Sequence, residues 1–227
     1  STFADIPAQT GLGSSSAFCV GLLHALFALK GQLVTKYQLA SKAAELEVDI
    51  LGRIMGKQDH FISSYGNLNV FTFHSNEKVT VEPVFYKSKT RKALEKNLIM
   101  FYTSLKGDAS KVLDSQNKST YSKFETLLEM RDLVPTLRDV LISGKDLSRI
   151  GSILNRGWEL KRSITTEISS SVIDEYYKKA IDAGALGGKL LGAGGGGFLL
   201  FYVEPQKRKK VMTSLKELYP LKVGIDE

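Results

Sequence analysis

The chain has 227 residues, of which 43% are hydrophobic and 24% charged, and its formal net charge is +7 at pH 7. This composition excludes a disordered chain, and no apolar run reaches the roughly 18 residues that a membrane-spanning helix needs. The basic residues are spread out, without interleaved aromatic residues, which argues against nucleic acid and suits an anionic small molecule. The single cysteine, Cys19, lies in an apolar run, so we expect a buried thiol and a reducing cytoplasm.

Hydrophobic periodicity predicts two helices near the start of the chain. The first covers residues 14–30, and Gly31 follows its end. Its apolar stripe comprises Phe18, Leu22, Leu26 and Leu29. The second begins at a capping box on Thr35 and runs to about Leu51. Its inward side chains are expected to be Leu39, Ala43, Leu46 and Ile50.

The next segment, residues 52–60 (GRIMGKQDH), is polar and contains glycine, which predicts a loop. Alternating apolar residues then predict a hairpin with strands in residues 67–74 and 78–84. The highly charged segment 86–97 is the candidate domain boundary. We therefore expect two domains, residues 1–90 and residues 91–227.

The second domain is expected to begin with a buried strand at residues 98–103. Helices are predicted at residues 109–116, 120–143, 146–162, 170–183 and 205–218. Residues 187–203 (GGKLLGAGGGGFLLFYV) predict strand, tight turn and strand, and a short strand is expected at residues 221–225. Helices and strands mix without regular alternation, so the predicted fold class is α+β.

Two glycine-rich stretches stand almost 180 residues apart, QTGLGSSSA at residues 9–17 and KLLGAGGGGF at residues 189–198. In the first, glycines allow a tight turn and three serines open a helix, which gathers free N–H groups and the positive end of the helix dipole. Such a point suits phosphate, and the hydroxyls could bind Mg²⁺. An ordinary serine cap is the alternative. The stretch matches no P-loop, dinucleotide fingerprint, nucleophile elbow or protein-kinase catalytic loop.

Two acidic residues stand twelve positions apart, Glu47 and Asp59. Glu47 follows a flank of small alanines, so its carboxylate could reach an uncrowded inward space, or it could be a solvated helical glutamate. Asp59 could line a site or cap a helix. His60, beside it, is the weaker candidate, and the histidines and cysteine show no metal-site spacing.

Together these stretches resemble the GHMP kinases, the family of galactokinase, homoserine kinase, mevalonate kinase and phosphomevalonate kinase. PAQTGLGSSSA (residues 7–17) is similar to the family's second motif, with Ser16 where alanine usually stands. EVDILGRIMGKQD (residues 47–59) is similar to the stretch with the magnesium-binding glutamate and catalytic aspartate, and KLLGAGGGGFLLFY (residues 189–202) to the third motif. The first motif has no counterpart here, so we expect a truncated chain.

The resemblance implies a fold, a cofactor and a set of site residues. The fold would be a ribosomal protein S5 domain 2-like N-terminal domain, incomplete here, followed by a ferredoxin-like C-terminal domain. Asp59 would be the catalytic residue, and Ser15 and Glu47 would hold Mg²⁺. The ATP phosphates would be bound by Gly11, Leu12, Gly13, Ser14, Ser15 and Ser16. The loop against the transferring phosphate and the substrate would be Gly192, Gly194, Gly195 and Gly196.

Within the family, the phrases GKQDH (residues 56–60), WELK (158–161) and the third motif are similar to D-glycero-D-manno-heptose 7-phosphate kinases. The implied substrate is a small-molecule sugar phosphate, phosphorylated at its anomeric hydroxyl in a route to surface polysaccharide. The alternatives are a GHMP kinase of another sugar or polyol, and a non-catalytic nucleotide-binding member or fragment. Candidates for binding the substrate phosphate, left unranked, are Lys57, Lys106, Lys161 and Arg162. We expect a cytoplasmic protein with no membrane or nucleic-acid partner, and a homodimer stays open.

Overall fold

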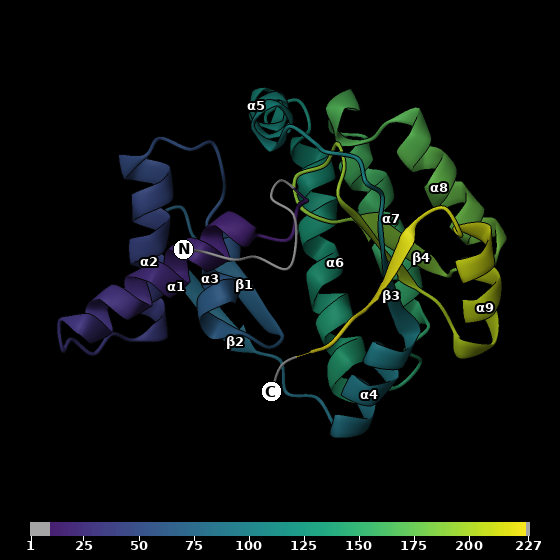
Figure 1. The fold of residues 1–227 in the computed structure, drawn as a ribbon, viewed down its shortest axis with the longest axis horizontal. Helices are drawn as coiled ribbons and strands as arrows, with labels where there is room; N and C mark the ends of the chain where they lie inside the picture. The colour runs from purple at the N-terminus through teal and green to yellow at the C-terminus, as the bar shows by residue number, and fades with distance from the viewer. Residues whose placement is uncertain (1–9, 226–227) are drawn as a thin grey trace.

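The computed structural model describes residues 10–225, and Figure 1 shows a helical part with a hairpin beside a larger part built on a sheet. Residues 7–9, which open the first glycine motif, lie outside the described residues. The elements of the helical part are α1 (Ser14–Leu29), α2 (Lys36–Ala44), the π-helix η1 (Glu45–Ile50), α3 (Gln58–Tyr65), β1 (Asn69–Phe73) and β2 (Val79–Pro83).

Helices α1, α2 and α3 pack against one another, and α3 also carries the aromatic side chain that meets the hairpin. Phe61 of α3 is 1% exposed and contacts the rings of Tyr37, Tyr65 and Phe71. The predicted hairpin and the capping box on Thr35 are both confirmed. Cys19 is buried, as expected.

The apolar side chains predicted to form the stripe of α1 do not face this core. They are exposed at Phe18 (53%), Leu22 (45%), Leu26 (43%) and Leu29 (83%), whereas Cys19 and Val20 are buried. Ile50 is 67% exposed, so the prediction that it faces inward is wrong. The reason is the π-helix: the i→i+5 bond from Leu51 N–H to Leu46 O (2.9 Å) widens the turn and rotates later side chains around the axis. Glu47 is buried instead.

The larger part is a four-stranded antiparallel sheet with strand order β4-β5-β3-β6. Its strands are β3 (Leu98–Tyr102), β4 (Gly187–Leu190), β5 (Phe198–Tyr202) and β6 (Tyr219–Lys222). The surrounding helices are α4 (Ser88–Asn97), α5 (Ala109–Ser119), α6 (Phe124–Ser143), α7 (Arg149–Arg162), the 3₁₀-helix η2 (Thr166–Ile168), α8 (Ser171–Asp182) and α9 (Pro205–Ser214). This mixture confirms the α+β class.

Alternating residues of the strands supply two cores, one on each face of the sheet. Phe101 and Phe201 face a core that includes Trp158 of α7 and Ile173 of α8. Tyr202 faces the other core, built with α4, α6 and the start of α7. Within residues 10–225, no helix combines the length and the hydropathy that crossing a membrane requires.

Two local predictions need correction. Residues 58–60 belong to α3, so the loop between η1 and α3 comprises residues 51–57 rather than the predicted 52–60. The link between β4 and β5 is not a tight turn but residues 191–197, which run along the backbone of Thr10, Leu105 and Ile168. The domain limits remain a prediction; residue 90 lies within α4, whose Leu94 packs against the sheet.

Candidate active site

The first glycine-rich stretch forms the turn that begins α1. Gly13 occupies the N-cap position with φ 67° and ψ 22°, a left-handed conformation that suits glycine, and no side chain in the described part of the chain caps the helix. The first intrahelical bond is donated by Ala17 N–H to Gly13 O at 2.9 Å. The N–H groups of the three preceding serines therefore stand at the positive end of a 16-residue helix, an arrangement that binds anions.

Glu47, on η1, is a buried carboxylate with hydrogen-bond partners on α1 and α3. Its side chain is 3% exposed, and it accepts hydrogen bonds from the Ser15 hydroxyl of α1 and from His60 Nε2 of α3 (2.8 Å). Because a carboxylate only accepts, Nε2 of the fully buried His60 carries the hydrogen. Burial alone would raise the pKa of Glu47, but the bonds from Ser15 and His60 outweigh it and lower the pKa. Glu47 is therefore held ionised.

Ser15 and Glu47 converge on one cationic group. Arg53 Nη1 lies 2.5 Å from Ser15 Oγ and 2.5 Å from Glu47 Oε1, and the Arg53 side chain is about half exposed. No three His, Cys, Asp or Glu side chains gather as a metal cage anywhere in residues 10–225. One carboxylate and one hydroxyl fit Mg²⁺, which is commonly held by one or two carboxylates together with substrate phosphates. Their role as magnesium ligands remains a prediction.

Asp59 lies beside the first glycine stretch. It is the second residue of α3, and a Cβ added to Gly13 would lie 3.3 Å from its carboxyl carbon. Burial raises the pKa of Asp59, and the nearby charges of His60 and Lys161 partly offset that rise. The carboxylate therefore stands at the N-terminus of α1, close to where a bound phosphate chain would lie.

The second glycine-rich stretch reaches the first. A Cβ on Gly192 would lie 2.4 Å from Gly11 Cα, so the two backbones touch where neither residue has a side chain. Gly194 and Gly196 have a packing reason of their own, because a Cβ would lie 2.8 Å from Ile168 Cα and 2.5 Å from Leu105 O, respectively. The structure thus brings the two stretches together, and contact of the second with phosphate stays a prediction.

The contact between these backbones is testable by Gly192→Ala. Gly192 has φ +70°, and the added methyl would meet Gly11, so we expect a loss of about 1–3 kcal/mol in the free energy of unfolding. Urea unfolding measures it. The matched control is Gly21→Ala, in α1 with nothing within 4 Å, where a gain of about 0.5–1 kcal/mol is expected. An equal stability of Gly192→Ala and the unsubstituted protein would contradict the contact.

The four cations that the sequence left unranked have different surroundings. Lys57 pairs with Glu77, and Lys106 is exposed. Arg162 pairs with Asp174 at 3.3 Å. Lys161 is distinct, because it donates to Gly192 O and its charge acts on Asp59.

Desolvation by burial, together with the neighbouring charge of Lys189, lowers the pKa of Lys161 to about 8, despite the attraction of Asp59. Lys189, on β4, was not among the sequence candidates. His60 is the weaker candidate beside Asp59 in the sequence, and Arg53 is not among the sequence candidates. The sequence carries one signal for Lys189, His60 and Arg53: each is a basic side chain within or next to one of the motifs.

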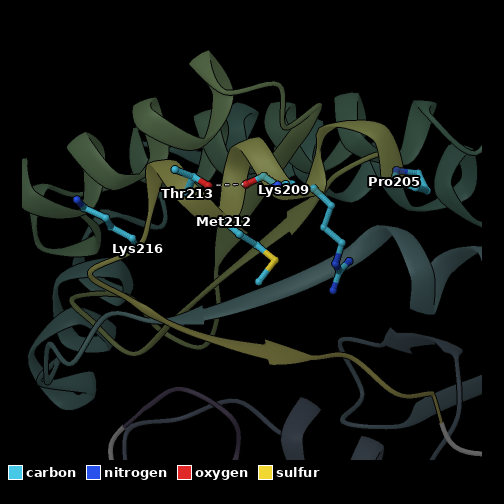
Figure 2. Close-up of a pocket in the computed structure, with 6 residues that line it drawn as sticks. Pro205, Lys209, Met212, Thr213 and Lys216 are labelled. Carbon is cyan, nitrogen blue, oxygen red and sulfur yellow. Dashed lines mark hydrogen bonds between the residues drawn. The ribbon is translucent and has the colours of Figure 1, made fainter.

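A separate hollow of about 600 Å³ lies along α9 (Figure 2). The residues that line it are Pro205, Arg208, Lys209, Met212, Thr213 and Lys216. It shares no residue with either glycine stretch or with the acidic pair. Arg208 instead donates to Lys96 O (2.8 Å) and Leu98 O (3.2 Å) at the end of α4. The hollow therefore does not belong to the candidate active site.

Comparison with known proteins identifies related sequences and structures. Residues 1–67 match the GHMP kinases N terminal domain, and residues 133–221 match the GHMP kinases C terminal domain, together more than half of the chain. The D-glycero-alpha-D-manno-heptose 7-phosphate kinase of Campylobacter jejuni is 30% identical over 219 residues, covering 95% of this chain and 64% of that protein. The mevalonate kinase of Pyrococcus horikoshii is 28% identical over 222 residues, covering 94% of this chain and 61% of that one.

A solved structure, described as a D-glycero-D-manno-heptose 1-phosphate kinase from Bacteriodes thetaiotaomicron, has a TM-score of 0.77 and 25% identity. It matches 98% of this chain and 63% of its own. The chain thus spans slightly less than two thirds of the length of these relatives. The glycine turn, the buried glutamate and the aspartate described above lie within the N-terminal match, and the second glycine stretch lies within the C-terminal match. The chain belongs to the GHMP kinase family.

Proposed function

We propose that this protein transfers the γ-phosphoryl group of ATP to the anomeric hydroxyl of D-glycero-D-manno-heptose 7-phosphate, giving the 1,7-bisphosphate. The observation that carries this proposal is the position of Asp59, a half-buried carboxylate against Gly13 at the N-terminus of α1. The named activities of the Campylobacter and Bacteriodes relatives support the choice of a heptose phosphate. Supply of nucleotide-activated heptose for surface polysaccharide would follow from that product.

In the proposed reaction, the protein supplies position and charge. The N–H groups at the start of α1 bind the ATP phosphates, and Ser15 and Glu47 hold Mg²⁺. The bound ion would offset negative charge on the phosphate oxygens. Asp59 orients the anomeric hydroxyl and accepts its proton while the sugar oxygen bonds to the γ-phosphorus and the bond to the ADP oxygen breaks. Because burial raises the pKa of Asp59, it is a stronger base than an exposed aspartate.

A second candidate is a GHMP kinase acting on another sugar or polyol. It is favoured by the mevalonate kinase of Pyrococcus horikoshii (28% identical) and the galactokinase of Pyrococcus furiosus (26% identical over 238 residues). These identities are lower than that of the heptose phosphate kinase. A non-catalytic member is disfavoured because Glu47 and Asp59 are both present and both lie at the glycine turn.

The test is a ³¹P NMR assay with Mg-ATP and D-glycero-D-manno-heptose 7-phosphate, after circular dichroism has established that the protein is folded. Galactose, mevalonate and hexose phosphates serve as competing acceptors in parallel reactions. A new anomeric phosphate signal with the heptose alone is the expected result. Transfer to another acceptor would support the second candidate, and no transfer to any acceptor from a folded protein would support a non-catalytic member or fragment.

A further inference from the structure

Two lysines on the sheet side of the candidate site are not explained by the roles given so far. Lys161 lies in the last turn of α7, and Lys189 lies on β4, the strand that leads into the second glycine stretch. We propose that Lys161 and Lys189 form a paired-ammonium site for the phosphoryl group that is transferred, beside Asp59. This inference rests on the proposed function and adds the cation that stabilises charge on the moving group.

Lys161 is held in place at the junction of the two glycine stretches. Its ammonium donates to Gly192 O, and Gly192 touches Gly11 in the turn that begins α1. Asp59 lies on the other flank of that turn, against Gly13. Lys161 therefore stands within the electrostatic reach of the proposed base, and each of the two changes the pKa of the other.

Lys189 has no structural partner to explain it. Its neighbours on β4, Gly188 and Leu190, are buried, and Leu190 joins the core on one face of the sheet. Lys189 points to the opposite face, because side chains alternate along a strand. In the part of the chain that the structure describes, its ammonium makes no hydrogen bond or ion pair, and burial lowers its pKa.

The two ammonium groups repel, since the charge of Lys189 lowers the pKa of Lys161. Lys161 has both the Lys189 ammonium and the Asp59 carboxylate within electrostatic reach, so the two desolvated lysines and the one carboxylate leave an excess of positive charge. A doubly or triply charged phosphoryl group between ATP and the acceptor hydroxyl would balance that excess. The lysines and the first turn of α1 would then bind the same group from two sides.

The test compares Lys161→Met, Lys161→Arg and Lys189→Met with the unsubstituted protein, using Lys209→Met on α9 as a control that removes the same charge elsewhere. Steady-state rates are measured with ATP and the heptose phosphate from pH 6 to 10. Lys161→Met is expected to lower kcat about 10²- to 10³-fold with little change in the KM for the sugar phosphate. Lys161→Arg, which keeps the charge, should recover at least tenfold of that loss, and Lys209→Met should change nothing.

The dependence of the rate on pH distinguishes an anion-binding role of Lys161 from a purely structural role, in which Lys161 only holds Gly192 in place through their hydrogen bond. The ammonium of Lys161 is charged below a pH of about 8 and neutral above it, so the rate should fall as pH rises through that value. Lys189→Met removes the repulsion and should move this fall to higher pH, and Lys161→Arg should abolish it. Asp59 lies beside Gly13, and His60 bonds Glu47; both are retained in all variants, so a difference between variants does not come from them. An unmoved fall in Lys189→Met would overturn the pairing.

A binding measurement keeps the inference testable if no acceptor is phosphorylated. Calorimetry with a non-hydrolysable Mg-ATP analogue should show affinity about tenfold or more weaker in Lys161→Met, with Mg-ADP affinity unchanged. Equal loss for both nucleotides would refute the site. A rise in the KM for the sugar phosphate with unchanged kcat would place the lysines on the substrate's own phosphate and also refute it. Urea unfolding of each variant excludes a folding defect.

Discussion

Substitution Asp59→Asn is expected to lower the rate of phosphoryl transfer about 10²- to 10⁴-fold, the usual worth of a positioned general base. Asparagine has the same shape, so it fits beside Gly13 without disturbing the turn, but it cannot accept the proton of the sugar hydroxyl. Nucleotide affinity should stay within about twofold, because the proposed phosphate contacts come from α1. Single-turnover rates and calorimetry with a non-hydrolysable Mg-ATP analogue measure the two quantities.

The stability of this variant has an expected sign. Burial raises the pKa of Asp59 in the folded protein, so at neutral pH the ionised carboxylate costs stability, and that cost fades as pH falls through the raised value. Asp59→Asn should therefore unfold at a higher urea concentration than the unsubstituted protein at pH 7. Asp49→Asn, at an exposed position, is the control for both rate and stability. Turnover within tenfold of normal in Asp59→Asn would show that another group is the base.

Substitution Glu47→Gln is expected to raise the Mg²⁺ concentration for half-maximal activity at least roughly 10- to 100-fold. Loss of a residue that only supports a metal ligand has an effect of that size, and Glu47 is proposed as a ligand itself. The carboxylate is 3% exposed and converges with Ser15 on the position now taken by the Arg53 guanidinium. Glutamine keeps the shape but lacks the charge, and its one acceptor oxygen can replace only one of the two carboxylate oxygens that accept from Ser15 and His60. Activity titrated with Mg²⁺ at saturating ATP and acceptor gives the measurement.

Glu45→Gln is the matched control, because Glu45 lies on the same π-helix, is about half exposed and pairs with Lys42 (2.6 Å). Its Mg²⁺ dependence should be unchanged, since exposed ion pairs contribute little. An unchanged Mg²⁺ requirement in Glu47→Gln, with a folded protein by circular dichroism, would remove Glu47 from the proposed metal site.

Several elements followed from the sequence alone because their signals are local. The capping box on Thr35 started α2 where expected, since both of its hydrogen bonds join residues three positions apart. Alternating apolar residues predicted the hairpin, and β-prone residues predicted β3 and β5. The two glycine stretches and the acidic pair carried the family resemblance, which the domain matches confirm.

Other features depend on interactions that no local pattern records. The π-turn at Glu45–Ile50 turned Ile50 outward and Glu47 inward, against the expected 3.6-residue period. Helix α3 was missed because its eight residues are short and polar at the start, and its stability comes from packing on α1 and α2.

The sequence by itself determined the family and the fold class and predicted most of the residues of the proposed chemistry, because glycine turns, caps and short motifs act over a few neighbouring positions. Only the tertiary structure decided which distant groups meet. It placed Gly192 against Gly11, His60 against Glu47, and Lys161 rather than Lys57, Lys106 or Arg162 near Asp59. Those contacts join residues far apart in the chain, and their distances depend on how α3, α7 and the sheet pack, which periodicity does not encode.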